Sequence, residues 1–231
     1  MSAQTAPSPT VRRGSAAAWL LRLRSDSSGT SLIEFAFLLP LFLSVGLMGV
    51  EVANMAMISM RVSDIATSVA DNASRLGQTD NSAVVPTITE ADIASVLRGA
   101  QEQGSSIQLA ENGRVILSSL ERHHVSNRQY IHWQRCFGQL DVGSAYGGAG
   151  YGLNGDEIAG LGRGSGLIAA PEGQAVMFAE VIYQYEPLFA GVLANEMTFR
   201  QEAAFLVRDD RNLLGNNGTG VGGASGANEC D

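Results

Sequence analysis

The longest apolar segment of the chain runs from Phe35 to Val50, sixteen residues without a charge. Apolar residues resume after Glu51 and continue to Met60, so a helix from Phe35 to Met60 would be about 39 Å long. A bilayer hydrocarbon core is about 30 Å thick, and membrane helices tolerate an internal proline such as Pro40. The pattern predicts one transmembrane helix near the N-terminus.

The helical pattern continues beyond the membrane segment. Apolar residues recur every three or four positions at Met55, Ile58, Val62, Ile65, Val69 and Leu76. Asn72 falls in the same seam, Asp71 can pair with Arg75 at i,i+4, and Gly77 is a plausible stop. We expect this stripe to pack on the globular body of the same chain; binding of another subunit is the alternative.

The remaining pattern predicts a short helix and several strands. Thr89 can cap a helix over 89–104, with Asp92 at the reciprocal position of a capping box. Strands are predicted at 107–110, 114–120, 130–136, 174–185 and 197–208. The pair Asn112-Gly113 is typical of a type I′ hairpin turn between the first two. A long helix followed by strands predicts a pilin-like α+β fold, an antiparallel sheet with the helix on one face.

Glycine-rich stretches separate these elements and define the expected domain organisation. Residues 141–173 and the tail 215–231 are rich in glycine and predict flexible loops. We therefore expect a leader over 1–29, a transmembrane and juxtamembrane helix over 30–77, a head over 78–214 and a flexible tail over 215–231.

Charge is distributed unevenly along the chain. The four arginines before Gly29 face one acid, a net charge of +3, whereas the rest carries 11 arginines and 22 acids, a net charge of −11. By the positive-inside rule the N-terminus is cytoplasmic and the head is exported to the periplasm. An acidic head also argues against a nucleic acid partner.

The two cysteines, Cys136 and Cys230, lack the spacing of a zinc site. In an exported head they can form a disulfide, and two unrelated thiols are the alternative. His123, His124 and His132 have no third ligand at a fixed offset, and no nucleophile with a base is apparent. The sequence therefore predicts no metal, no cofactor and no enzymatic activity.

Gly29 and Glu34 indicate more than a plain anchor. Gly29 follows a polar run and lets an extended backbone approach a protease closely. Cleavage after Gly29 would make Thr30 the N-terminus, a cation one helical turn from Glu34. A carboxylate in the membrane costs about 3 kcal/mol at the centre, less near the edge, and a cation of the same chain or of a neighbouring subunit reduces that cost.

Two alternatives remain for this segment, and two remain for Glu51. A signal peptide removed by signal peptidase would release a periplasmic protein, even an enzyme, although the apolar run is long for one. An uncleaved anchor would present the head as a periplasmic binding module. Glu51 is either an interfacial charge that reaches water or a contact to a partner helix.

The stretch "GTSLIEFAFLLPLFLSVGLMGVEVANM" resembles the prepilin-type N-terminus, with Gly29 before the scissile bond and Glu34 at the fifth mature position. Glu34 with Phe35, an apolar run containing proline, and the second acid Glu51 are similar to TadE-like minor pseudopilins of tight-adherence (Flp) pilus systems. A weaker similarity lies in "EVIYQYEPLF" and "EAAFLVRDDR". Thr30 replaces the phenylalanine usual in classical pilins, and Phe35 the tyrosine frequent in the Flp group.

The resemblance implies a function in pilus assembly. It implies leader removal by a prepilin peptidase in the bacterial inner membrane, and helix pairing through Glu34, Phe35 and Glu51. The implied partners are other pseudopilins, the major pilin, the inner-membrane assembly platform and membrane lipid. The product would support assembly without being the main subunit.

Overall fold

The computed structural model describes residues 29–77, 85–153, 155, 157–164, 166–189, 196–208, 211–223 and 229–230. Residues 1–28 of the predicted leader lie outside these ranges. The chain divides into two compact units, residues 1–49 and 50–231. From here on, the head means this second unit, which includes the C-terminal part of the long helix as well as residues 78–214.

Helix α2 (Thr30–Ser74) is the long helix that the sequence predicts. It continues through Pro40, and its apolar window near the N-terminus is wholly unburied. By length and composition this helix could cross a membrane.

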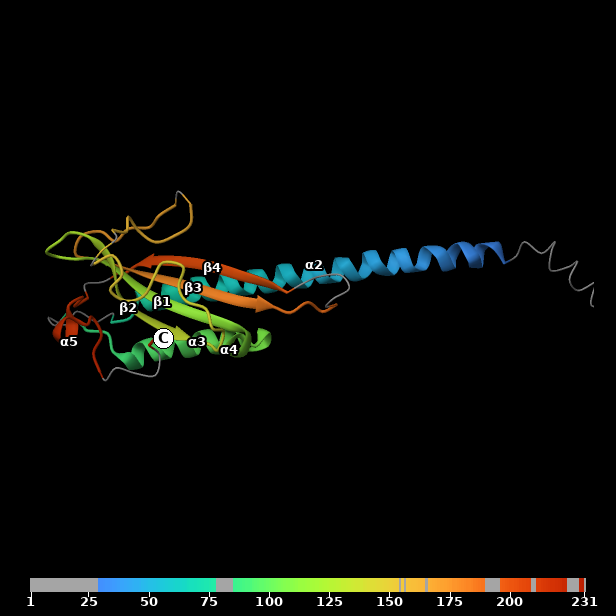
Figure 1. The fold of residues 1–231 in the computed structure, drawn as a ribbon. Helices are drawn as coiled ribbons and strands as arrows, with labels where there is room; N and C mark the ends of the chain where they lie inside the picture. Colours follow the sequence, from blue (N-terminus) through green and yellow to red (C-terminus); the bar gives the residue numbers. More distant parts are fainter. Residues whose placement is uncertain are drawn as a thin grey trace, which may run out of the picture. The chain divides into compact units, whose positions relative to one another are not determined.

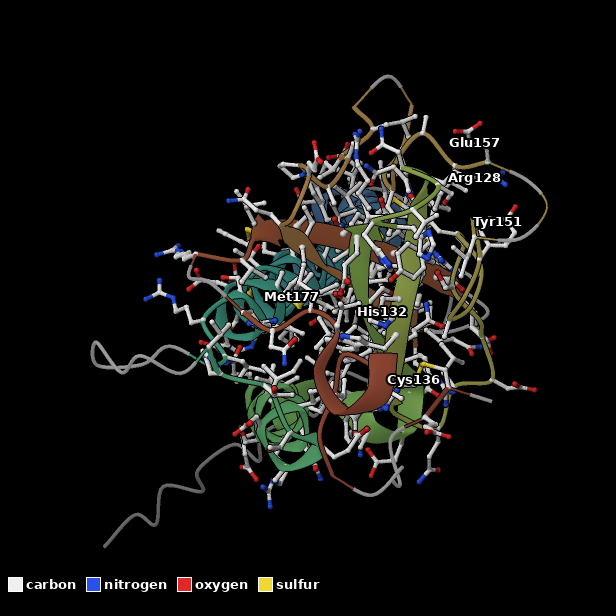
Figure 2. The ribbon with its side chains drawn as sticks, turned by 90° about the vertical axis from the view of Figure 1, so that its left-hand side faces the viewer. Arg128, His132, Cys136, Tyr151, Glu157 and Met177 are labelled. Atoms are coloured by element: carbon white, nitrogen blue, oxygen red, sulfur yellow. A yellow bond between two sulfur atoms is a disulfide. The ribbon has the colours of Figure 1, made fainter. Side chains whose placement is uncertain are left out.

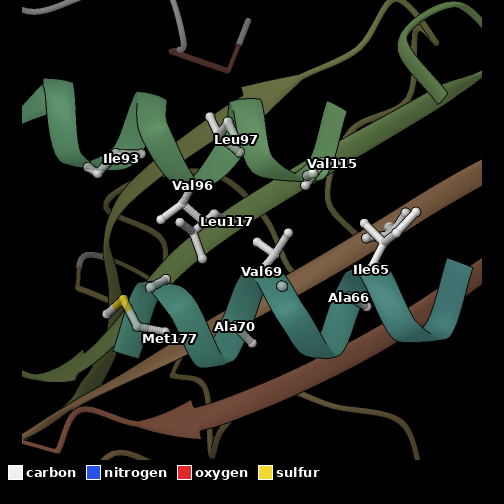
Figure 3. Packing of buried hydrophobic residues seen from close by; sticks show 14 of the residues in the cluster. Ile65, Ala66, Val69, Ala70, Ile93, Val96, Leu97, Val115, Leu117 and Met177 are labelled. Carbon is white, nitrogen blue, oxygen red and sulfur yellow. The ribbon is translucent and has the colours of Figure 1, made fainter. Parts of the chain in front are cut away.

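The C-terminal part of α2 forms part of the core of the head. Val62, Ile65 and Val69 are buried there, and Met55, Ile58 and Leu76 pack against the same cluster, so the predicted packing of the stripe on its own chain is confirmed. Figure 3 shows α2 and α3 (Glu90–Gln103) side by side over the strands.

The end of α2 differs in one detail from the prediction. Asn72 is exposed and is not part of the buried seam, where Ala73 lies instead. The pair Asp71–Arg75 forms at 2.9 Å, and Gly77 has the positive φ of +78° that follows many helix ends.

Helix α3 begins with the predicted capping box. The Thr89 hydroxyl accepts from the Asp92 N–H, and the Asp92 carboxylate accepts from the Thr89 N–H. Ile93, Val96, Leu97 and Ala100 are the buried face of this helix. The capping box therefore determines where this helix begins, and the spacing of its apolar residues determines which face is buried.

Four antiparallel strands form the sheet: β1 (Gly113–Arg122), β2 (Gln129–Phe137), β3 (Ala175–Tyr185) and β4 (Met197–Leu206). Their order is β2-β1-β3-β4. Figure 1 shows them side by side, with the β1–β2 turn and the short helix α5 (Gly215–Gly218) at one end and the end of β3 at the other. The predicted α+β class with an antiparallel sheet is confirmed.

The predicted strand at 107–110 and the type I′ hairpin after it are wrong. A 3₁₀ turn η1 (Ser105–Ile107) and a short helix α4 (Leu109–Asn112) occupy this region. Gly113 is extended, with φ of −138°, and begins β1. A Cβ on Gly113 would lie 2.5 Å from the buried Leu109 side chain, so this glycine permits close packing and not a turn.

The two faces of the sheet are covered differently. The main core lies between one face and the helices α2 and α3, and it includes Leu117, Trp133 and Met177 from the strands. On the opposite face, residues of the glycine-rich segment such as Leu161 and Ala170 pack on Leu120 and Phe178. The glycine-rich segment, although irregular, thus covers one side of the head.

Candidate functional site

Helix α2 begins directly after Gly29. The Gly29 carbonyl accepts a hydrogen bond from the Ile33 N–H at 3.2 Å. Gly29 and Thr30 are exposed, and a Cβ built on Gly29 would meet no described atom within 4 Å. The bond between these two residues therefore lies at an exposed helix start, where a side chain in place of Gly29 would meet none of the described residues.

Glu34 and Phe35 lie on the exposed part of α2. Both are exposed, and Glu34 accepts no hydrogen bond from any residue that the structure describes. The apolar residues that follow are also exposed, including Leu41 and Phe42. This surface is apolar except for one carboxylate near its start.

Glu51 is buried in the head, with only 4% of its surface exposed. Its carboxylate accepts hydrogen bonds from the Tyr185 hydroxyl at 2.6 Å and from the Phe189 N–H at 3.1 Å. The Tyr185 hydroxyl in turn accepts from the Asn54 side chain at 2.9 Å. Glu51 therefore joins helix α2 to the end of strand β3.

This arrangement corrects the sequence-based interpretation of Glu51. Glu51 was expected to reach water or to contact a partner helix. Instead, its carboxylate is enclosed by residues of the same chain. Burying an ionised carboxylate is costly unless donors satisfy it, and here two donors from the β3 end do so. Burial and the hydrogen bond to Glu51 raise the pKa of Tyr185, which keeps its hydroxyl protonated as a donor.

The helix that carries these residues has recognisable relatives. Residues 29–75 match the model of the TadE-like protein family. The match includes the whole stretch from Gly29 to Met55 and confirms its resemblance to TadE-like proteins. The TadE-like segment, residues 29–75, starts at Gly29 and ends one residue after α2, so it contains Glu34 and Glu51 but not the sheet.

The match extends no further along the chain. The stretches "EVIYQYEPLF" and "EAAFLVRDDR" lie outside it, although the first contains Tyr185 and Phe189, the partners of Glu51. No curated protein and no solved structure matches the chain.

The predicted disulfide between Cys136 and Cys230 is present and joins β2 to the C-terminal end of the chain. The adjacent Arg135 pairs with Glu90 of α3 and lies 3.9 Å from Glu229. A groove of about 530 Å³ beside the disulfide is lined by Arg114, Arg135 and the glycine-rich segment. Among the described residues, no group of three or more His, Cys, Asp or Glu could hold a metal.

The segment 211–223, which leads into and includes part of the tail, makes defined contacts that its glycine content does not predict. Arg211 donates to the carbonyls of Ala73 and Leu76 at 3.0 and 2.6 Å and so closes the end of α2. Burial lowers the pKa of Arg211 to about 10, which leaves it a cation at neutral pH. Gly222 exchanges backbone hydrogen bonds with Ile88 and Glu90.

A buried ion pair fastens this tail to the sheet. His132 is the extra residue of an irregularity in the β1–β2 register, which aims its ring at the tail (Figure 2). Nδ1 lies 2.9 Å from a Glu121 oxygen, and Nε2 lies 2.8 Å from the Gly218 carbonyl. Both partners are acceptors, so the cationic form of the ring, which carries a proton on each nitrogen, satisfies both contacts. Strand alternation alone could not identify this pair.

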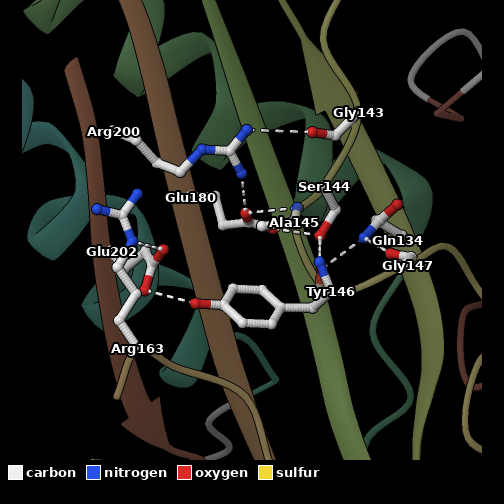
Figure 4. A network of polar contacts seen from close by, with 11 residues as sticks. Gln134, Gly143, Ser144, Ala145, Tyr146, Gly147, Arg163, Glu180, Arg200 and Glu202 are labelled. Atoms are coloured by element: carbon white, nitrogen blue, oxygen red, sulfur yellow. Dashed lines mark hydrogen bonds and ion pairs between the residues drawn. The ribbon is translucent and has the colours of Figure 1, made fainter. Parts of the chain in front are cut away.

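Glu180 is the centre of a second polar network, on the opposite face (Figure 4). It is fully buried in β3 and pairs with Arg200 of β4 at 2.7 Å. It also accepts from the Ser144 hydroxyl and from the Ala145 N–H in the glycine-rich segment. This network explains how a segment with so little side-chain volume is held on the sheet.

Proposed function

We propose that the chain is a minor pseudopilin-like component of a tight-adherence (Flp) pilus assembly system. The single observation that carries this proposal is the match of residues 29–75 to TadE-like proteins, which begins at Gly29. The TadE-like family is a structural, non-enzymatic kind of protein associated with the pilus. We assign the chain a structural role of the same kind.

The proposal includes removal of residues 1–29 by a prepilin peptidase. Gly29 and Thr30 are exposed at the start of α2, and nothing described packs against Gly29. The processed chain would remain a single-pass protein of the bacterial inner membrane, with the head in the periplasm. The four arginines before Gly29 favour this orientation.

Glu34 would then pair with the α-amino group of Thr30 in a neighbouring subunit. Its carboxylate is exposed and has no partner in the described part of the chain. A charge in lipid is costly, so an exposed carboxylate at the head of an apolar helix favours association with a cation. The neighbouring subunits are other pseudopilins and the major pilin, assembled on the inner-membrane platform.

The mass of the mature chain from membranes tests cleavage. We expect a chain that begins at Thr30 when the peptidase is active, and a full-length chain for Gly29→Val, because a side chain there hinders the protease but not the fold. Ser31→Ala is the matched control and should be processed normally. A wild-type chain that begins at Met1 in these cells would instead support the uncleaved anchored binding module.

Glu34→Ala tests assembly. We expect normal membrane insertion but loss of the protein from the assembled pilus system, measured by co-purification with the other pilins and by piliation. Asp64→Ala removes an exposed acid from the same helix within the head and should assemble normally. Normal piliation in Glu34→Ala would contradict the role given to this carboxylate.

A further inference from the structure

The uncharged run of α2 is short for the membrane it is proposed to cross. Sixteen residues separate Glu34 from Glu51. At 1.5 Å per residue they extend about 24 Å, whereas a typical hydrocarbon core is about 30 Å thick. Exposed apolar residues beyond Val50 would complete this length at the membrane boundary.

Glu51 does not interrupt this surface, because the head encloses it. Its carboxylate is bonded to Tyr185 and Phe189 and is almost inaccessible. From Val52 to Met60 the chain has no charged residue, and Val52, Met57 and Met60 are each more than half exposed, at 53%, 59% and 60%. After Glu34, the next exposed charge on the helix is Arg61.

The segment after β3 and the start of β4 add exposed apolar residues next to the partners of Glu51. Leu188 is 57% exposed and precedes Phe189, whose N–H binds Glu51. Met197 is 48% exposed and pairs in the sheet with Tyr185, the other donor to Glu51. Two elements of the head thus present large apolar side chains close to the point where the chain leaves the proposed membrane segment.

We propose that this end of the head, formed by Val52, Met57, Leu188 and Met197, inserts into the interfacial region of the bilayer. The inference rests on the proposed single-pass anchor, because Val50, the last residue of the apolar run, is also the first residue of the head. Insertion would remove these side chains from water and complete the apolar length that the run lacks.

Charge contributes little to this attachment, because the exposed cation nearest to Met57 in the sequence, Arg61, is opposed by two acids near the other residues of the surface. Glu186 and Glu196, the exposed charged residues nearest to Leu188 and Met197 in the sequence, are acids and would not attract anionic lipid. Zwitterionic phosphatidylcholine should therefore be sufficient, and salt should have little effect.

Quenching by brominated phosphatidylcholine tests the docking surface. The full chain is reconstituted in vesicles as Leu188→Trp, and Val125→Trp provides the control, because Val125 is exposed in the β1–β2 turn at the opposite end of the sheet. We expect bromine near the glycerol end of the acyl chains to quench the introduced tryptophan of Leu188→Trp at least threefold more than that of Val125→Trp, after subtraction of the parent chain. Equal quenching would overturn the proposal.

Three further measurements separate the alternatives. Met197→Trp replaces Leu188→Trp if the latter does not fold, and the same outcomes apply. Quenching of the Leu188→Trp chain that requires anionic lipid or disappears in high salt would overturn the apolar mechanism. The introduced tryptophan could also be shielded from an aqueous quencher in native membranes but not in pure lipid. This result would mean that a protein partner covers the surface, and it would also overturn the proposal.

Alkaline carbonate extraction distinguishes failure of this inference from failure of the proposed function. A Leu188→Trp chain that stays in the membrane while its introduced tryptophan is unquenched refutes the docking surface and leaves the anchor intact. A chain that is extracted refutes the anchor itself, and with it the proposed function.

Discussion

Glu34 and Glu51 belong to the same helix and flank the same apolar run, yet their surroundings differ completely. Glu34 is exposed and accepts no hydrogen bond from the described chain, whereas Glu51 is enclosed by Tyr185 and Phe189. Spacing within the helix does not cause this difference; the sheet that folds against one of the two carboxylates does. A carboxylate that accepts hydrogen bonds from its own chain stabilises the fold. One that accepts none there is available to a partner.

The same contrast separates the two parts of α2. The apolar window before the head contains no buried residue, while Val62 to Ser74 contribute a complete buried face to the core. Changes in the first part should therefore affect membrane assembly, and changes in the second should affect stability of the head. Head stability is measured by denaturation of the full chain in detergent micelles, followed by Trp133 fluorescence in a Trp19→Phe background.

The largest expected loss of stability comes from Ile65→Ala. Ile65 is fully buried between α2 and the sheet, and such truncations cost about 3 kcal/mol in lost burial and cavity formation. Leu41→Ala is the matched change in the exposed part and should alter the free energy of unfolding of the head by less than about 0.5 kcal/mol. Equal effects would mean that the two parts of α2 fold as one cooperative unit.

Glu51→Ala should lower the free energy of unfolding of the head by about 2 kcal/mol. The substitution leaves the Tyr185 hydroxyl and the Phe189 N–H without their acceptor in a buried position. Glu34→Ala should leave the same free energy unchanged. An unchanged free energy of unfolding in Glu51→Ala would show that this carboxylate does not stabilise the head.

A double-mutant cycle sharpens the same contrast at a smaller scale. Tyr185→Phe keeps the ring and removes the donor, so Glu51→Ala and Tyr185→Phe should couple with an interaction energy of about 1.5 kcal/mol. Glu34→Ala combined with Tyr185→Phe should be additive. Additivity in the first pair would show that the bond at 2.6 Å contributes little.

The sequence predicted what depends on local patterns and missed what depends on distant contacts. The capping box at Thr89 and the strand at 197–206 follow from spacing that neighbouring residues determine. The helical α4 region was predicted as a strand, because the burial of Leu109 overrides the turn preference of Asn112-Gly113. Glu51 was predicted to face water or a partner, because its donors lie 134 and 138 residues further along the chain.

A third buried carboxylate, Glu121, provides the smallest predicted effect and the only one that depends on pH near neutrality. Glu51 is satisfied by neutral donors, whereas Glu121 pairs with the His132 ring. Burial opposes the charge on His132, but the hydrogen bond and charge of Glu121, with the Gly218 carbonyl, outweigh it and raise the pKa of His132 above 6.5. Tyr130 also lies beside the ring, and burial together with Glu121 raises its pKa to about 12, so it remains neutral here.

Because the folded pKa of His132 is raised, its contribution to stability is complete below about pH 6.5 and is lost as the pH rises through the folded value. We expect wild type to be more stable than His132→Gln at low pH. As the pH rises through the folded pKa of His132, this difference in unfolding free energy should fall by on the order of 1 kcal/mol, the contribution of one hydrogen bond to a charged group. Hydrogen exchange at Gly220 and Gly222 should increase in parallel, since His132 holds this segment through Gly218. In a Glu51→Ala background the pH dependence of stability that His132 causes should persist unchanged, because neither donor to Glu51 is a histidine. Loss of this pH dependence in that background would mean that Glu51 and Glu121 act as one network.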